Sequence, residues 1–109
     1  MQKKIGKEDI SLNANWDVFE FYGDSNVAIL YSNIRFWIKH NEKNKKHFYG
    51  EKYWTYNTVE AFQELFPMWS YKQIRLMLQK LEDDKFLVIG NFNEKKYDKT
   101  KWYSLGKLK

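Results

Sequence analysis

The stretch "NTVEAFQELFPMWSYKQIRLMLQKLEDD", residues 57–84, predicts two helices separated by a tight turn. Asn57 is followed three residues later by Glu60, a variant of the capping box with which helices begin. Pro67 lacks a backbone N–H and opens the turn, and Ser70 can cap the helix that follows. Each helix then has an apolar face at helical spacing. These faces consist of Val59, Phe62, Leu65 and Phe66 in the first helix and Ile74, Met77, Leu78 and Leu81 in the second.

The segment before this pair predicts a longer helix and a brief strand. Residues 23–43, "GDSNVAILYSNIRFWIKHNEK", have apolar side chains at spacings of three and four, which predicts a helix of about four turns with Asp24 or Ser25 as its cap. Residues 41–52 are polar, contain a glycine and predict a loop. Residues 53–56, "YWTY", are β-prone and predict a short strand. The buried stripe of the helix is expected to be Val27, Leu30, Tyr31, Ile34, Trp37 and Ile38.

The residues after the second helix predict a β-hairpin. "KFLVIGNF", residues 85–92, and "KWYSL", residues 101–105, are β-prone runs, and Asn91, Asn93 and Asp98 are turn formers between them. The order helix, short strand, helix, tight turn, helix, hairpin is that of a winged helix-turn-helix. We therefore expect an α+β fold with three main helices, a short strand and a C-terminal β-hairpin as the wing.

Length and composition favour one small domain. The 109 residues suit a single hydrophobic core. We place the winged helix-turn-helix domain at residues 24–109 and an N-terminal arm at residues 1–23, whose structure stays open. The absence of cysteine excludes disulfides, thiolate zinc sites and cysteine nucleophiles, and it fits a reducing cytoplasm. No stretch approaches the roughly 20 apolar residues of a membrane span, so a cytoplasmic protein without membrane contact is expected.

The positive charge is concentrated in the second part of the chain. Residues 1–66 hold 9 basic and 9 acidic residues, whereas residues 67–109 hold 10 basic and 5 acidic residues. An anionic partner is therefore expected to meet the second part first.

The second helix of the pair is the candidate recognition helix. In a helix-turn-helix it lies in the DNA major groove, with its first turns toward the base edges. A rotation of 100° per residue gives this helix a polar face opposite Ile74. Gln can pair with adenine and Arg with guanine, but any solvated helix face carries such residues. Leu76 on that face could touch a thymine methyl group or mark a protein interface. The candidate DNA contacts are Ser70, Tyr71, Lys72, Gln73, Arg75 and Gln79.

The wing supplies a second group of candidate contacts. Its lysines are expected beside the recognition helix, on the phosphate backbone or the minor groove, with a merely solvated loop as the alternative. Strand alternation puts Trp102 and Ser104 on one face and Tyr103 on the other, and we expect Trp102 to pack against the helices. Tyr97, at the tip, could stack or hydrogen-bond at the sugar–phosphate surface. The candidate residues are Lys95, Lys96, Tyr97, Lys99 and Lys101.

Another basic group follows the first long helix. Lysines at a helix C-terminus favour its dipole and a charge run is usually solvated, so nucleic-acid contact is less expected here. The group consists of Lys39, Lys43, Lys45, Lys46, His47 and Lys52.

Residues 53–105 resemble the winged-helix domain at the N-terminus of phage and plasmid replication proteins of the replisome-organiser and DnaD-like kind. In that family an aromatic-Thr strand leads into a helix ending Phe-Pro, and a Ser-capped helix with Ile and paired leucines follows. A wing with Asn, Tyr-Asp, a basic residue, Thr and Trp-Tyr closes the domain. The run "YDKTKWY", residues 97–103, is the most specific part of the match. The matching residues are Trp54, Thr55, Phe66, Pro67, Ser70, Ile74, Leu78, Leu81, Asn93, Tyr97, Asp98, Lys99, Thr100, Trp102 and Tyr103.

The resemblance implies a double-stranded DNA-binding module in replication initiation or in phage and plasmid regulation. Such domains often have glycine before the first wing strand, where this chain has "DDKF", residues 83–86, so the helix must end in another way. Longer members carry a further helical domain for oligomerisation or helicase loading, which the match does not include. A second copy of the chain or another replication protein stays open as a partner.

No enzymatic function is expected, because the sequence shows no nucleophile with a base, metal cluster or phosphate loop. His40 and His47 are seven residues apart with no carboxylate at ligand spacing, so neither a metal nor another cofactor is expected. The alternative to DNA binding is a winged helix that serves as a protein-interaction module through its aromatic surface and Leu76. Salt separates the two, because phosphate binding weakens steeply with ionic strength and an aromatic interface hardly changes.

Overall fold

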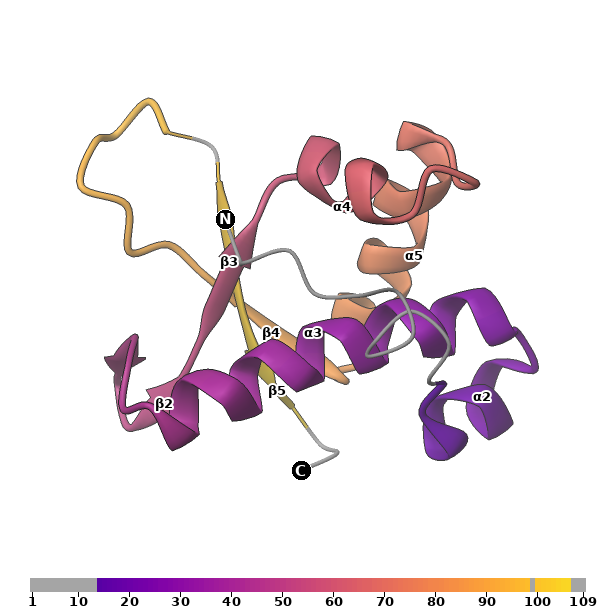
Figure 1. Cartoon of the computed structure of the whole chain (residues 1–109), viewed down its shortest axis with the longest axis horizontal. Coiled ribbons are helices and arrows are strands. Elements are labelled where there is room, and N and C mark those ends of the chain that lie inside the picture. Colours follow the sequence, from indigo (N-terminus) through magenta and orange to yellow (C-terminus); the bar gives the residue numbers. More distant parts are fainter. Residues whose placement is uncertain (1–13, 99, 107–109) are drawn as a thin grey trace.

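The computed structural model describes residues 14–98 and 100–106 and has an α+β architecture, as expected. Figure 1 shows α3 crossing the strands, with α4 and α5 together on one side of the molecule and the long β4–β5 connection on the other. No helix in the described ranges is long and apolar enough to cross a membrane. In chain order the elements are α2 (Trp16–Tyr22), α3 (Ser25–Lys43), β1 (Phe48–Tyr49), β2 (Lys52–Tyr53), β3 (Thr55–Asn57), α4 (Val59–Leu65), α5 (Tyr71–Asp83), β4 (Leu87–Gly90) and β5 (Lys101–Leu105).

Helix α3 is the central element of the core. Asp24 caps it, since its side chain accepts a hydrogen bond from the backbone N–H of Asn26 at 2.9 Å. The helix has 19 residues, which is more than five turns and longer than predicted. It packs against α2, α5, β2, β3 and β5. Every residue of the predicted stripe from Val27 to Ile38 is buried, so this prediction is confirmed.

Helices α4 and α5 form the predicted pair with a tight turn between them. The cap of α4 differs from the prediction: Thr58, not Asn57, accepts the hydrogen bond from the N–H of Ala61, at 3.1 Å. Asn57 instead accepts from the N–H of Thr58 at 3.1 Å. Ser70 caps α5 as predicted, in a capping box with Gln73. The stripe of α5 faces the core, and its four residues are Ile74, Met77, Leu78 and Leu81.

Part of the predicted N-terminal arm is the helix α2, which belongs to the core. Asn15 caps α2, and Val18 is completely buried. The hydroxyl of Tyr22 donates to the carbonyl oxygen of Lys80 at 2.9 Å and lies 2.5 Å from a carboxylate oxygen of Asp84, at the end of α5. Residues 14–22 are therefore packed on the domain. The rest of the predicted arm, residues 1–13, lies outside the described residues.

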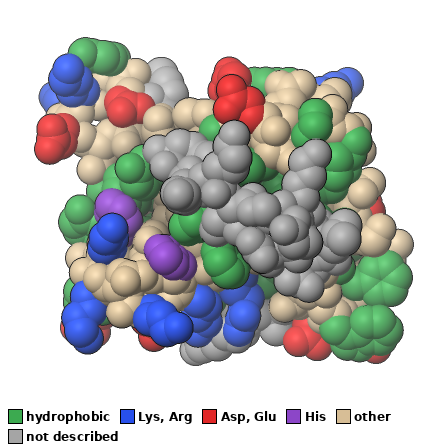
Figure 2. Space-filling model, in the orientation of Figure 1, with side chains coloured by type: hydrophobic (Ala, Val, Ile, Leu, Met, Phe, Trp, Pro, Cys, Tyr) green, Lys and Arg blue, Asp and Glu red, His purple; other side chains and the backbone are tan. Residues whose placement is uncertain are grey.

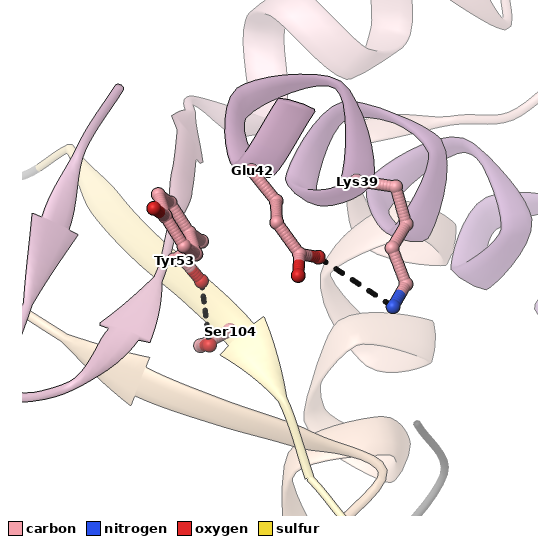
Figure 3. Close-up of polar contacts among 4 residues, drawn as sticks. All are labelled: Lys39, Glu42, Tyr53 and Ser104. Atoms are coloured by element: carbon pink, nitrogen blue, oxygen red, sulfur yellow. Dashed lines mark hydrogen bonds and ion pairs between the residues drawn. The ribbon is translucent and has the colours of Figure 1, made fainter. Parts of the chain in front are cut away.

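The strands form a three-stranded antiparallel sheet in the order β3-β5-β4 and a separate β1–β2 hairpin. The β4–β5 pairing confirms the predicted C-terminal hairpin. The β1–β2 hairpin lies where a loop was predicted, and Gly50 and Glu51 turn it with φ of 57° and 63°. Figure 3 shows the hydrogen bond of 2.7 Å from the Ser104 hydroxyl to the carbonyl oxygen of Tyr53, which links β5 to the end of β2.

The two faces of β5 are opposite to the prediction. Tyr103 is 1% exposed, belongs to the core cluster and meets Phe62 of α4 with ring centroids 6.2 Å apart. Trp102 is also buried, but its ring contacts are with Tyr49, Tyr56, His47 and Phe92 on the other face of the sheet. Alternation correctly separated Trp102 from Tyr103. Both are large and apolar enough to be buried, so alternation alone could not assign the helical face.

The chain leaves α5 through a lysine at a position where glycine is usual. Lys85 adopts the left-handed conformation with φ of 68°, and its N–H donates to the carbonyl oxygen of Glu82 at 3.1 Å. The N–H of Phe86 then donates to Leu81 at 2.9 Å. Gly106 passes so close that a Cβ atom there would collide with the carbonyl oxygen of Lys85. Lys85 therefore adopts the left-handed conformation that a glycine usually adopts after a helix.

Candidate nucleic-acid interface

The outer face of α5 carries the polar side chains that the sequence predicted. Ser70, which caps the helix, begins this surface. Leu76 is 45% exposed in the middle of the helix. All six candidate contacts on α5 are solvent-exposed, and they are Ser70, Tyr71, Lys72, Gln73, Arg75 and Gln79.

A groove of about 430 Å³ lies between α5, the start of α4 and the strand β5. Its α5 wall includes Tyr71, Arg75 and Gln79, and Lys101 of β5 lies in its lining too. Tyr103, which packs into the core, also contributes to the lining. The groove therefore brings three predicted α5 residues and one predicted wing residue to a single concave surface.

Two glutamines on α5 already have partners within the helix. The side-chain oxygen of Gln73 accepts from the N–H of Ser70 at 3.4 Å, as part of the capping box. The amide of Gln79 donates to a carboxylate oxygen of Asp83 at 2.9 Å. Contact with a base edge would have to use their other amide groups or replace these hydrogen bonds. Arg75 has five N–H donors and lines the groove, so it is the better candidate for an anionic ligand.

The groove also contains acidic side chains, Glu60 and Asp98. The carboxylate of Asp98 accepts a hydrogen bond from the backbone N–H of Thr100 at 2.9 Å. Hydrogen bonds from Thr100 lower the pKa of Asp98 below its usual value, so this group stays negatively charged near neutral pH. A phosphate would therefore be favoured near Arg75 and Lys101 and disfavoured next to Asp98.

The β4–β5 connection, of which residues 91–98 and 100 are described and which is called the wing loop below, is held at its base mainly by the side chain of Asn93. Its amide nitrogen donates to the carbonyl oxygens of Thr100 at 2.8 Å and Asp98 at 3.1 Å. Its amide oxygen accepts from the indole N–H of Trp102 at 2.8 Å. The sequence indicated Asn93 only as a turn former. Three hydrogen bonds from one side chain explain how the loop keeps a defined shape with few apolar contacts.

The tip of the wing is well exposed but stands apart from α5. Lys95 and Lys96 are exposed, and Tyr97 is 75% exposed with the ammonium of Lys95 5.8 Å from its ring centroid. Figure 1 places this loop across the molecule from α5, with β3 and the start of α4 between them. The tip and the groove are thus two separate surfaces. Lys99, also predicted as a contact, lies outside the described residues.

The additional basic group lies at the end of α3 and around the β1–β2 hairpin. Figure 2 shows lysine or arginine side chains gathered on this side of the molecule, with histidine next to them. Lys39 forms an ion pair with Glu42 at 3.6 Å, which Figure 3 shows. Lys43, Lys45 and Lys46 are exposed.

Comparisons with protein-family models, curated proteins and solved structures gave no match to this chain. Within the described ranges, no three His, Cys, Asp or Glu side chains are grouped so that they could hold a metal ion.

Proposed function

We propose that this chain is a double-stranded DNA-binding module with a winged helix-turn-helix fold. In this proposal α5 enters the major groove, and the lysines of the β4–β5 connection contact the backbone. The observation that carries the proposal is the groove that brings Arg75 and Lys101 together beside the exposed face of α5. The groove joins the two elements that a winged helix uses on DNA.

The chemistry of the groove supports this function. Arg75 offers a planar donor set that suits a guanine edge or a phosphate, and Lys101 supplies a compact cation. Tyr71, near the start of α5, is 45% exposed and can donate to a phosphate oxygen. The excess of basic residues in residues 67–109 acts in the same direction, by attracting the duplex before these contacts form.

A role in phage or plasmid replication initiation, or in regulation, is the narrower proposal, and it rests on the sequence resemblance. The residues that carry this resemblance include Trp54, Pro67 and Ser70, which lie before β3, in the α4–α5 turn and at the cap of α5. A replication origin is therefore the first class of duplex to test, against duplexes of random sequence.

The test compares Arg75→Ala with Lys80→Ala, because each removes one cation from an exposed position of α5. Lys80 does not line the groove and is the matched control. Fluorescence anisotropy on origin-type and random duplexes measures affinity and its salt dependence. We expect Arg75→Ala to lose about 1–3 kcal/mol of discrimination, or to flatten the salt slope by about one unit if it contacts phosphate. If the two substitutions had equal effects on duplex binding, the groove would not be part of the surface that contacts DNA.

The second candidate function is a protein-interaction module without DNA readout. It is favoured by Met68 and Leu76, which are 63% and 45% exposed on the turn and on α5. Two results together would establish this second function in place of the first. Leu76→Asp would abolish a complex with another protein, and Arg75→Ala would bind duplex DNA as tightly as the parent.

A further inference from the structure

A second concave surface, of about 470 Å³, lies between the wing loop and the β1–β2 region. Trp102 lies at its base and is 6% exposed. Tyr56 meets Trp102 with ring centroids 4.5 Å apart, and Tyr49 stacks on Phe92 at 4.5 Å with an angle of 12° between the rings. This aromatic concavity is on the side of β5 opposite to the helical core.

The rings of the aromatic concavity are open to solvent and at the same time held in place. Tyr49 and Tyr56 are 41% and 39% exposed. The indole N–H of Trp54 donates to the carbonyl oxygen of Tyr49 at 2.9 Å, and that of Trp102 donates to Asn93. Exposed rings on a rigid support lose little conformational entropy when a flat ligand stacks on them.

His47 has a left-handed backbone conformation, and its ring contacts Trp102. His47 has φ of 58°, and its carbonyl oxygen accepts from the N–H of Trp54 at 3.0 Å. Its ring lies 5.4 Å from those of both Tyr56 and Trp102. Burial, together with nearby Lys46, lowers the pKa of His47, which favours the uncharged ring. Non-glycine residues in this conformation are uncommon and are enriched at binding sites.

Charged side chains of both signs surround the aromatic concavity. Lys95 lines it, and Lys46 is next to His47 in the chain. Glu94 and Asp98 also line it, so the rim carries both signs. Two described segments that contribute to it, residues 43–52 and 93–98, contain six lysines and three acidic residues. A ligand that combines flat rings with spaced negative charges matches both the rings and this excess.

We propose that the aromatic concavity binds single-stranded nucleic acid, with unpaired bases stacked on Tyr49 and Tyr56 and phosphates near Lys46 and Lys95. Stacking on aromatic side chains beside a basic rim is the usual way in which proteins hold unpaired strands, and it tolerates any base sequence. A duplex cannot use this surface in the same way, because its base faces are already stacked. The site is thus distinct from the groove at α5, and its test does not depend on the DNA function proposed there.

Binding of a fluorescein-labelled 12-nucleotide oligothymidylate tests the proposal. Tyr56→Leu should weaken binding about tenfold, while Tyr97→Ala, which removes an exposed ring outside the aromatic concavity, should change it less than about twofold. Thermal melting of both variants checks that the fold is kept. Equal losses in the two variants, or no loss in either, would overturn the proposal.

A second measurement on the unaltered chain avoids any effect of substitution on folding. A single strand containing 5-iodouracil is photocross-linked to the protein, and the attached peptide is identified by mass spectrometry. We expect attachment at Tyr49, Tyr56 or His47. Attachment confined to α5 or to the wing tip would show that strands bind elsewhere and would overturn the proposal.

Discussion

Asn93 illustrates how one side chain can give a polar loop a defined shape. Its amide bonds to two carbonyl oxygens on the returning part of the loop and to the indole of Trp102. A loop with two lysines in its described part would otherwise have little to oppose its conformational entropy. The same side chain therefore supports both the wing loop and the aromatic concavity.

Replacing Asn93 by Ala should destabilise the domain by about 1–3 kcal/mol, since it leaves the part-buried indole N–H of Trp102 without its acceptor. Urea unfolding of Asn93→Ala and of the parent measures the difference. Lys96→Ala, an exposed substitution in the same loop, is the control and should stay within about 0.5 kcal/mol of the parent. A loss no larger than that of the control would mean that water replaces the asparagine fully.

At the scale of elements, helix boundaries and the ends of strands set the geometry of the candidate surfaces. Lys85, two residues after α5, turns the chain toward β4, and Gly106, directly after β5, packs against the carbonyl oxygen of Lys85. A left-handed lysine is less favourable than glycine because its Cβ atom approaches the following carbonyl oxygen.

Lys85→Gly should therefore stabilise the domain by about 0.5–1 kcal/mol, despite the greater freedom of glycine in the unfolded chain. Lys85→Ala is the matched control: it removes the same charge but keeps the Cβ atom, so no gain is expected. Guanidinium unfolding at fixed ionic strength measures the free energy of unfolding of both variants and of the parent. A destabilised glycine variant would show that the lysine side chain, not the backbone, matters at this corner.

Most of the elements followed from the sequence, because helix periodicity and caps act locally. The stripes of α3 and α5 and the cap at Ser70 were all predictable for this reason. The assignment of Trp102 to the helical face was wrong, because it depends on which side of β5 the helices pack. The β1–β2 hairpin was missed because each strand has two residues and its turn uses Glu51 with positive φ. The sequence predicted the candidate site only as two separate groups of residues. That Arg75 and Lys101 line the same groove could not be predicted, because it depends on tertiary packing.

At the scale of the whole molecule, three tyrosine hydroxyls in or against the core make stability depend on pH. Burial raises the pKa of Tyr31 to about 12. Burial is also the main cause of the raised pKa of Tyr22 and of Tyr103, with Asp84 adding to the effect at Tyr22. The folded state therefore keeps these three protons at a pH where the unfolded chain releases them.

Stability should consequently be constant up to about pH 9 and fall above pH 10, the usual pKa of tyrosine. In that range the unfolded state binds fewer protons than the folded state, so the free energy of unfolding decreases as pH rises. Urea titrations between pH 8 and pH 11 measure this fall. Tyr103→Phe should make the fall shallower than in the parent, because it removes one of the groups with a raised pKa. Identical pH profiles for the two proteins would contradict the raised pKa of Tyr103.

The salt dependence of duplex binding tests the central claim most directly. Fluorescence anisotropy of a labelled 20-base-pair duplex, titrated with the unaltered chain between 50 and 200 mM salt, gives the dissociation constant at each concentration. If the groove and the wing bind phosphates, the logarithm of the binding constant should fall linearly with the logarithm of salt, by about 0.9 for each phosphate contacted. The absence of saturable binding at 50 mM salt, or an affinity that does not change with salt, would contradict the proposal that this chain binds double-stranded DNA.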